Sequence, residues 1–111
     1  MAKFMVLYRS SVSAQEQMAS ASAEQAQAGM DMWMRWAEKV GPALVDMGSP
    51  LGASRSVPSG AQAGTGSTIA GFSVLEADSA DAVVALLDGH PHLQAPGAAI
   101  EVLEYLQLPG M

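Results

Sequence analysis

Three short stretches of the chain have the hydrophobic pattern of β-strands. Residues 3–9 (Lys-Phe-Met-Val-Leu-Tyr-Arg) and residues 68–76 are rich in β-branched, aromatic and other large apolar residues. Residues 98–108 alternate apolar with polar positions and end at Pro109-Gly110. Apolar runs this short and rich in β-formers favour strands over helices. The pattern therefore predicts strands at the start, in the middle and at the end of the chain.

Residues 14–40 change to Ala, Gln, Glu and Met, which are strong helix formers. Apolar residues recur there at helical spacing and fall on one face: Ala23, Ala26, Met30, Trp33, Ala37 and Val40. On the opposite face, Asp31 and Arg35 have the spacing of an ion pair. We expect Trp33 to pack toward the sheet, Gly41-Pro42 to end the helix, and Gly29 or residues 20–22 to interrupt it.

The remaining segments complete a recognisable order of elements. Residues 43–57 contain Gly and Pro and predict an irregular edge strand, because proline cannot donate to a central ladder. Residues 59–67 read as a flexible connection. Asp78 or Ser79 caps a second helix that runs to Leu87. The order is β-α-β-β-α-β, which predicts one domain over residues 1–111 with an α+β, ferredoxin-like fold, one antiparallel sheet and both helices on one face.

The predicted strands carry apolar residues on both faces. An antiparallel sheet with one face on helices is normally polar on the other. Here large apolar residues occupy both parities of the first and last strands: Phe4, Met5, Val6, Leu7, Tyr8, Ile100, Val102, Leu103 and Tyr105. The second face is therefore expected to be covered by another copy of the chain, in a homodimer.

Composition excludes several classes of protein. The 111 residues suit a single core, and the net charge of −6 argues against nucleic-acid or anionic-membrane partners. The absence of cysteine excludes disulfides, zinc fingers and thiol nucleophiles. No apolar run approaches the ~20 residues of a membrane span. The chain enters its first strand without a leader pattern, so we expect a cytoplasmic protein.

His90 and His92 lie together in the turn before the last strand. Two imidazoles without a third histidine or a cysteine are a weak metal site, so no metal and no cofactor are expected. His90 fits a general acid/base, because histidine titrates near neutral pH, with Glu101 or Asp88 orienting it. The alternative is that His90 caps the preceding helix C-terminus and is easily protonated, while His92 is solvated.

The last strand offers a second candidate, Glu101. If Ile100 and Val102 face the helices, then Glu101 faces the open side of the sheet and can serve as a catalytic base or ligand anchor. The alternatives are an ion pair with Arg9, Arg35 or Arg55 and a place at a solvated rim. Trp36, Tyr105 and His92 are the candidates for lining a ligand pocket, although core packing is the commonest role of a methionine-tryptophan cluster such as the one that contains Met32 and Trp36.

Several motifs resemble the YCII-related (DGPF-type) family. They are Met5–Leu7, Gly48–Leu51, Ala70–Ser79, Gly89–Leu93 and Ile100–Glu104. The resemblance covers nearly the whole chain and implies a ferredoxin-like fold that dimerises into an α/β barrel. Most members of that family have no known function, and a few act on small aromatic or lactone-like substrates with a histidine and an aspartate as the acid/base pair.

This chain departs from the family pattern at the positions that carry the chemistry. The long first helix has no histidine, the usual Asp-Pro is replaced by His90-Pro91, and the Asp-Gly-Pro-Phe signature is absent. Only His90 occupies a family-relevant position. We expect a homodimer with a cleft for a small, largely apolar metabolite, with acid/base chemistry of lyase or isomerase type. The alternatives are a ligand-binding protein without turnover and a structural or interaction module.

Overall fold

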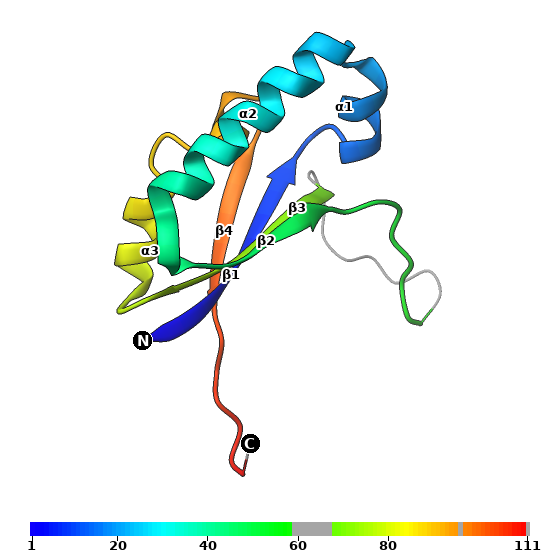
Figure 1. Cartoon of the computed structure of the whole chain (residues 1–111). Helices are drawn as coiled ribbons and strands as arrows, with labels where there is room; N and C mark the ends of the chain where they lie inside the picture. Colours follow the sequence, from blue (N-terminus) through cyan, green and yellow to red (C-terminus); the bar gives the residue numbers. More distant parts are fainter. Residues whose placement is uncertain (59–67, 96, 111) are drawn as a thin grey trace.

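The computed structural model describes residues 1–58, 68–95 and 97–110, and its elements follow the predicted order. They are β1 (Ala2–Ser10), α1 (Ala14–Ser20), α2 (Ala23–Val40), η1 (Gly41–Ala43), β2 (Leu44–Pro50), β3 (Thr68–Ala77), α3 (Ala80–Leu86), η2 (Pro91–Gln94) and β4 (Ala99–Glu104) (Figure 1). The expected connection over 59–67 lies outside the described residues. Within them, no helix is both long enough and apolar enough to cross a bilayer.

Four strands form one antiparallel sheet in the order β2-β3-β1-β4. The central pair runs from Ala2 opposite Ala77 to Ser10 opposite Thr68. β2 is an edge strand whose register with β3 shifts twice, as its Gly and Pro content predicted. The result is an α+β architecture with a single antiparallel sheet, compatible with the ferredoxin-like topology.

One face of the sheet carries the core. Phe4, Val6 and Tyr8 alternate along β1 and are 1%, 0% and 2% exposed. They share one cluster with Trp36 and Val40 of α2 and with buried residues of β3 and α3. Because both α2 and α3 contribute to this cluster, they cover the same face of the sheet (Figure 1).

The helix ends follow the local sequence. The long predicted helix is interrupted between Ser20 and Ala23, one of the two predicted places. There the Ser22 side chain accepts from the backbone N–H of Gln25, and the Gln25 side chain accepts from the Ser22 N–H, which is a reciprocal capping box. Gly41 ends α2 with a φ of 63°, which favours glycine.

The predicted buried face of α2 is wrong in its N-terminal half. Ala23 and Ala26 are exposed and Met30 is 55% exposed, because this half of the helix extends past the ends of the strands (Figure 1). Trp33 packs partly buried against the core, as expected, but Trp36 is the deeper residue, at 4% exposure.

The predicted ion pair between Asp31 and Arg35 is absent among the described residues, although both side chains are exposed as expected. The Asp31 carboxylate instead accepts a hydrogen bond from Gln27 Nε2 at 3.0 Å. Arg35 is therefore left without a carboxylate from its own helix.

The other face of the sheet, here called the open face, is apolar at its centre, with charged residues such as Lys3, Glu76 and Arg9 toward the ends of its strands. Met5 of β1 lies there between Val74 of β3 and Leu103 of β4. Leu7 lies between Phe72 of β3 and Glu101 of β4. Leu103 is 44% exposed, and Tyr105, just beyond β4, is 45% exposed. The helices that contribute to the core all lie on the opposite side of the sheet.

We expect Trp36→Ala to lower the free energy of unfolding by about 3–5 kcal/mol. The substitution leaves a cavity in the core and removes the indole N–H that Trp36 donates to the Leu86 carbonyl at 3.0 Å. Arg35→Ala, on the exposed neighbour, should cost well under about 1 kcal/mol. Urea denaturation of both variants measures the difference, and comparable losses would contradict the observed rotation of α2.

Candidate functional site

His90 lies between α3 and η2, where the local sequence turns its side chain inward. Gly89 precedes it with a φ of 72° and allows the chain to leave α3 sharply. Pro91 follows it and disfavours a helical backbone at the preceding residue. His90 accordingly adopts a non-helical conformation, with φ −58° and ψ 138°. The imidazole is consequently 1% exposed, in the core rather than in solvent.

Three aromatic rings surround the imidazole. Its centroid lies 4.9 Å from the ring of Tyr8, 4.5 Å from Trp33 and 4.4 Å from Trp36. Tyr8 belongs to β1, and the two tryptophans lie on α2. The rings of both tryptophans are steeply inclined to the imidazole, an arrangement that aromatic pairs favour. His90 therefore joins three segments that are distant in sequence.

Hydrogen bonding fixes the tautomer of His90. Its Nδ1 accepts the backbone N–H of His92 at 3.0 Å. A ring nitrogen that accepts has no proton, so the neutral ring carries its proton on Nε2. Within the described part of the chain, Nε2 is buried and has no hydrogen-bond partner. Buried unpartnered donors are rare and costly, so this one needs an explanation.

Burial, together with a smaller effect of the nearby charge of His92, lowers the pKa of His90 from 6.5 to about 4. The ring is therefore neutral at pH 7. The expectation that His90 caps the end of the preceding helix and is easily protonated is wrong, because its side chain caps the start of η2 instead. A proton-accepting role stays a prediction, and it requires Nδ1 to release the His92 N–H.

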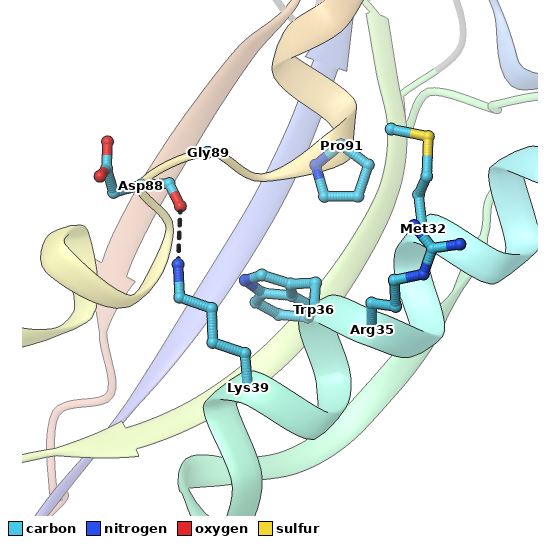
Figure 2. Close-up of a pocket in the computed structure, with 7 residues that line it drawn as sticks. All are labelled: Met32, Arg35, Trp36, Lys39, Asp88, Gly89 and Pro91. Carbon is cyan, nitrogen blue, oxygen red and sulfur yellow. Dashed lines mark hydrogen bonds between the residues drawn. The ribbon is translucent and has the colours of Figure 1, made fainter.

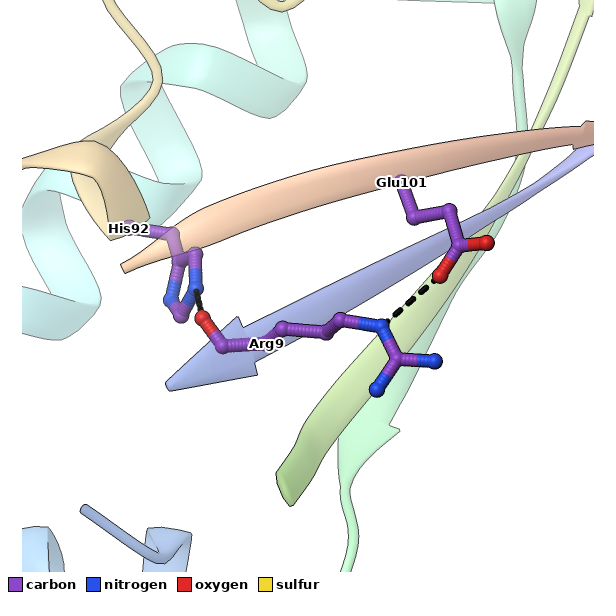
Figure 3. A network of polar contacts seen from close by, with 3 residues as sticks. All are labelled: Arg9, His92 and Glu101. Atoms are coloured by element: carbon purple, nitrogen blue, oxygen red, sulfur yellow. Dashed lines mark hydrogen bonds and ion pairs between the residues drawn. The ribbon is translucent and has the colours of Figure 1, made fainter. Parts of the chain in front are cut away.

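His92 is also buried, so the expectation that it is solvated is wrong. It is 9% exposed, and its Nε2 lies 2.8 Å from the carbonyl oxygen of Arg9. A carbonyl only accepts, so His92 Nε2 donates. The Arg9 side chain in turn pairs with Glu101, with Nε and Oε1 2.7 Å apart (Figure 3). This network connects η2, β1 and β4.

Glu101 takes the alternative position that the sequence left open, as the partner of Arg9. The two side chains are 44% and 31% exposed, so the pair contributes at most about 1 kcal/mol. Ile100 and Val102 pack toward the core, as expected, and Glu101 therefore lies on the open face. His90 is on the helix side. The structure does not bring these two predicted catalytic residues together.

The three predicted ligand-pocket residues occupy three different places. Trp36 lines an open pocket of about 230 Å³ between α2 and the turn before η2. The other residues lining it are Met32, Arg35, Lys39, Asp88, Gly89 and Pro91 (Figure 2). His92 is buried against Tyr8, with ring centroids 5.3 Å apart. Tyr105 follows β4, and its parity with Leu103 places it on the open face.

Tyr8 was not predicted as part of the site, although its parity with Phe4 and Val6 places it on the helix side. Its hydroxyl is 2.7 Å from Ser73 Oγ, which donates its only proton to the Met47 carbonyl at 2.7 Å. Tyr8 is therefore the donor to Ser73. Burial raises the pKa of Tyr8 to about 12. The phenol stays protonated and forms a wall of the site.

The described residues contain no group of three His, Cys, Asp or Glu side chains placed to hold a metal ion. No protein-family model matches the chain, and a search of the curated proteins finds no match.

The buried neutral imidazole should make stability depend on pH. Its pKa is about 4 in the folded chain and 6.5 when exposed, so the unfolded chain binds the extra proton between these values. The stabilisation is complete above pH 6.5 and is lost as the pH falls toward 4, up to about 3 kcal/mol. We expect His90→Gln to flatten this slope in urea denaturations.

Carboxylates titrate near the lower end of the same range, so the quantity to compare is the difference between the parent chain and His90→Gln. Equal pH slopes for the two proteins would mean that His90 is not buried as a neutral ring.

Proposed function

We propose that this chain is a YCII-related, ferredoxin-like protein that forms a homodimer and binds a small, largely apolar metabolite. The two subunits pack their open faces together into an α/β barrel. The observation that carries this proposal is the apolar character of the open face, on a sheet whose other face is already occupied by α2 and α3.

The chemistry of the open face suits a second copy. Leu103 and Tyr105 are nearly half exposed, and Met5 and Leu7 lie beside them on the central strand. Burying apolar surface yields about 25 cal/mol per Å², and methionine and aromatic residues are common in protein interfaces. A two-fold axis through this face would place the same residues opposite each other.

The ligand proposal is supported by the aromatic cluster and the pocket beside it. In its present tautomer His90 offers an N–H donor rather than a base, and its Nδ1 is occupied. This favours binding without turnover. A cytoplasmic location, with neither a nucleic-acid nor a membrane partner, belongs to the same proposal and is supported by the acidic, cysteine-free composition.

Acid/base chemistry of lyase or isomerase type is the second candidate, and it would use the unpartnered His90 Nε2–H. A neutral imidazole N–H can stabilise negative charge that develops on a substrate oxygen. In such a reaction His90 would act as the hydrogen-bond donor, and Glu101, which lies across the sheet as the partner of Arg9, would not contact the same substrate.

We expect sedimentation equilibrium at micromolar concentration to give twice the chain mass. Leu103→Asp should shift the species to one chain, because it places a charge in the proposed interface without a partner. Val84→Asp is the matched control, since Val84 is 58% exposed on α3, on the helix side. It should leave the dimer intact. A monomeric parent chain, or a dimer insensitive to Leu103→Asp, would contradict the proposal.

A further inference from the structure

We infer that the pocket between α2 and η2 binds a small carboxylate with a flat apolar body, held by Arg35 and Lys39 beside Trp36. The inference names a chemical class for the ligand of the proposed function and rests on that part of it. It does not depend on the homodimer, because the pocket lies within one chain and on the helix side.

The α2 side of the pocket is a stripe of the helix. Met32, Arg35, Trp36 and Lys39 follow one another at spacings of three, one and three, so they share one face. Asp88, Gly89 and Pro91 form the opposite wall. In Figure 2, Trp36 lies between Arg35 and Lys39, with Pro91 facing it across the pocket.

The charge at this pocket is unusual for the chain. The sequence has only 5 basic residues against 11 acidic ones, yet two of the five lie one helical turn apart here. Among the described residues the only ion pair joins Arg9 and Glu101, and residues 59–67 contain no Asp or Glu. Arg35 and Lys39 thus repel each other, and neither has a carboxylate within ion-pair distance among the described residues.

The one acidic residue at the pocket does not neutralise them. Lys39 Nζ donates to the backbone carbonyl of Asp88 at 3.4 Å, and the Asp88 carboxylate points away from Pro91 and Met32 (Figure 2). The Arg35 guanidinium has no hydrogen-bond or ion-pair partner among the described residues. It is therefore free to bind a carboxylate through two parallel hydrogen bonds, the geometry that arginine favours.

The apolar part of the pocket sets the shape of the ligand. The Trp36 ring is held in place by its hydrogen bond to the Leu86 carbonyl, and the Met32 thioether and the Pro91 ring stand beside it. A volume of about 230 Å³ is below the ~300–1,000 Å³ of sites for drug-sized ligands. It suits a single ring bearing one carboxylate.

The pocket also adjoins the buried imidazole. The rings of Trp36 and His90 are 4.4 Å apart, and Gly89 and Pro91, the neighbours of His90 in sequence, both line the pocket. A ligand bound in this pocket therefore changes the chemical environment of the turn, and the NMR signals of the Trp36 indole and the Gly89 amide report its binding.

Benzoate is the probe, with benzamide as the uncharged control of the same shape. In ¹H–¹⁵N spectra we expect benzoate to shift the Trp36 indole and Gly89 amide signals saturably, with a Kd on the order of 1 mM. Benzamide should bind about fivefold more weakly, the upper end of what an exposed ion pair contributes. Equal affinities for the two probes would overturn the inference, as would the lack of a saturable shift.

Variants test the residues. Arg35→Gln should weaken benzoate about fivefold and leave benzamide unchanged. Arg55→Gln, which removes an exposed cation whose hydrogen bond in the described part of the chain is to the Ser54 carbonyl, should change neither. Loss of benzoate binding in both variants would point to a general charge effect and overturn the site. If benzoate still binds to the Leu103→Asp chain, the site does not depend on the dimer. If the parent chain is a dimer but does not bind benzoate, the carboxylate site is wrong and the dimer proposal stands.

Discussion

A neutral imidazole can be buried when packing and at least one hydrogen bond offset the loss of water around its two nitrogens. At His90 the backbone N–H of His92 satisfies Nδ1, and three aromatic rings supply the packing. Each such ring pair is worth about 0.5–1.5 kcal/mol beyond its buried area. Because the rings come from β1 and α2, this contact sets how the turn before β4 meets the rest of the core.

The sheet separates two surfaces of different chemistry, and one connection runs between them. On the helix side are the aromatic cluster and the pocket with its two cations. On the open face are the apolar strand residues and the pair of Arg9 with Glu101. His92 donates to the Arg9 carbonyl, so the turn that holds His90 is tied to the strand whose side chain reaches the proposed dimer interface.

The sequence predicted what local rules control. The helix interruption near Ser22, the end of α2 at Gly41 and the edge position of β2 all follow from capping, glycine and proline preferences over a few residues. The alternation along β1 predicted that Phe4, Val6 and Tyr8 would face the same way.

What local rules could not give depends on distant contacts. The partners of His92 and Arg9 are 83 and 92 residues away in sequence. The exposure of Ala23 and Ala26 depends on where the sheet ends beneath α2. The spacing of apolar residues along the helix carries no information about that position. Pro91 did signal that the side chain of His90 leaves the helix, but not that it turns into an aromatic cluster.

The most direct test of this account is the protonation state of His90, read from its imidazole ¹⁵N shifts. At a pH between its ordinary pKa of 6.5 and the lowered value of about 4, the ring should be neutral, with the proton on Nε2 and none on Nδ1. A ring protonated on both nitrogens in that range, or a neutral ring with its proton on Nδ1, would contradict the account.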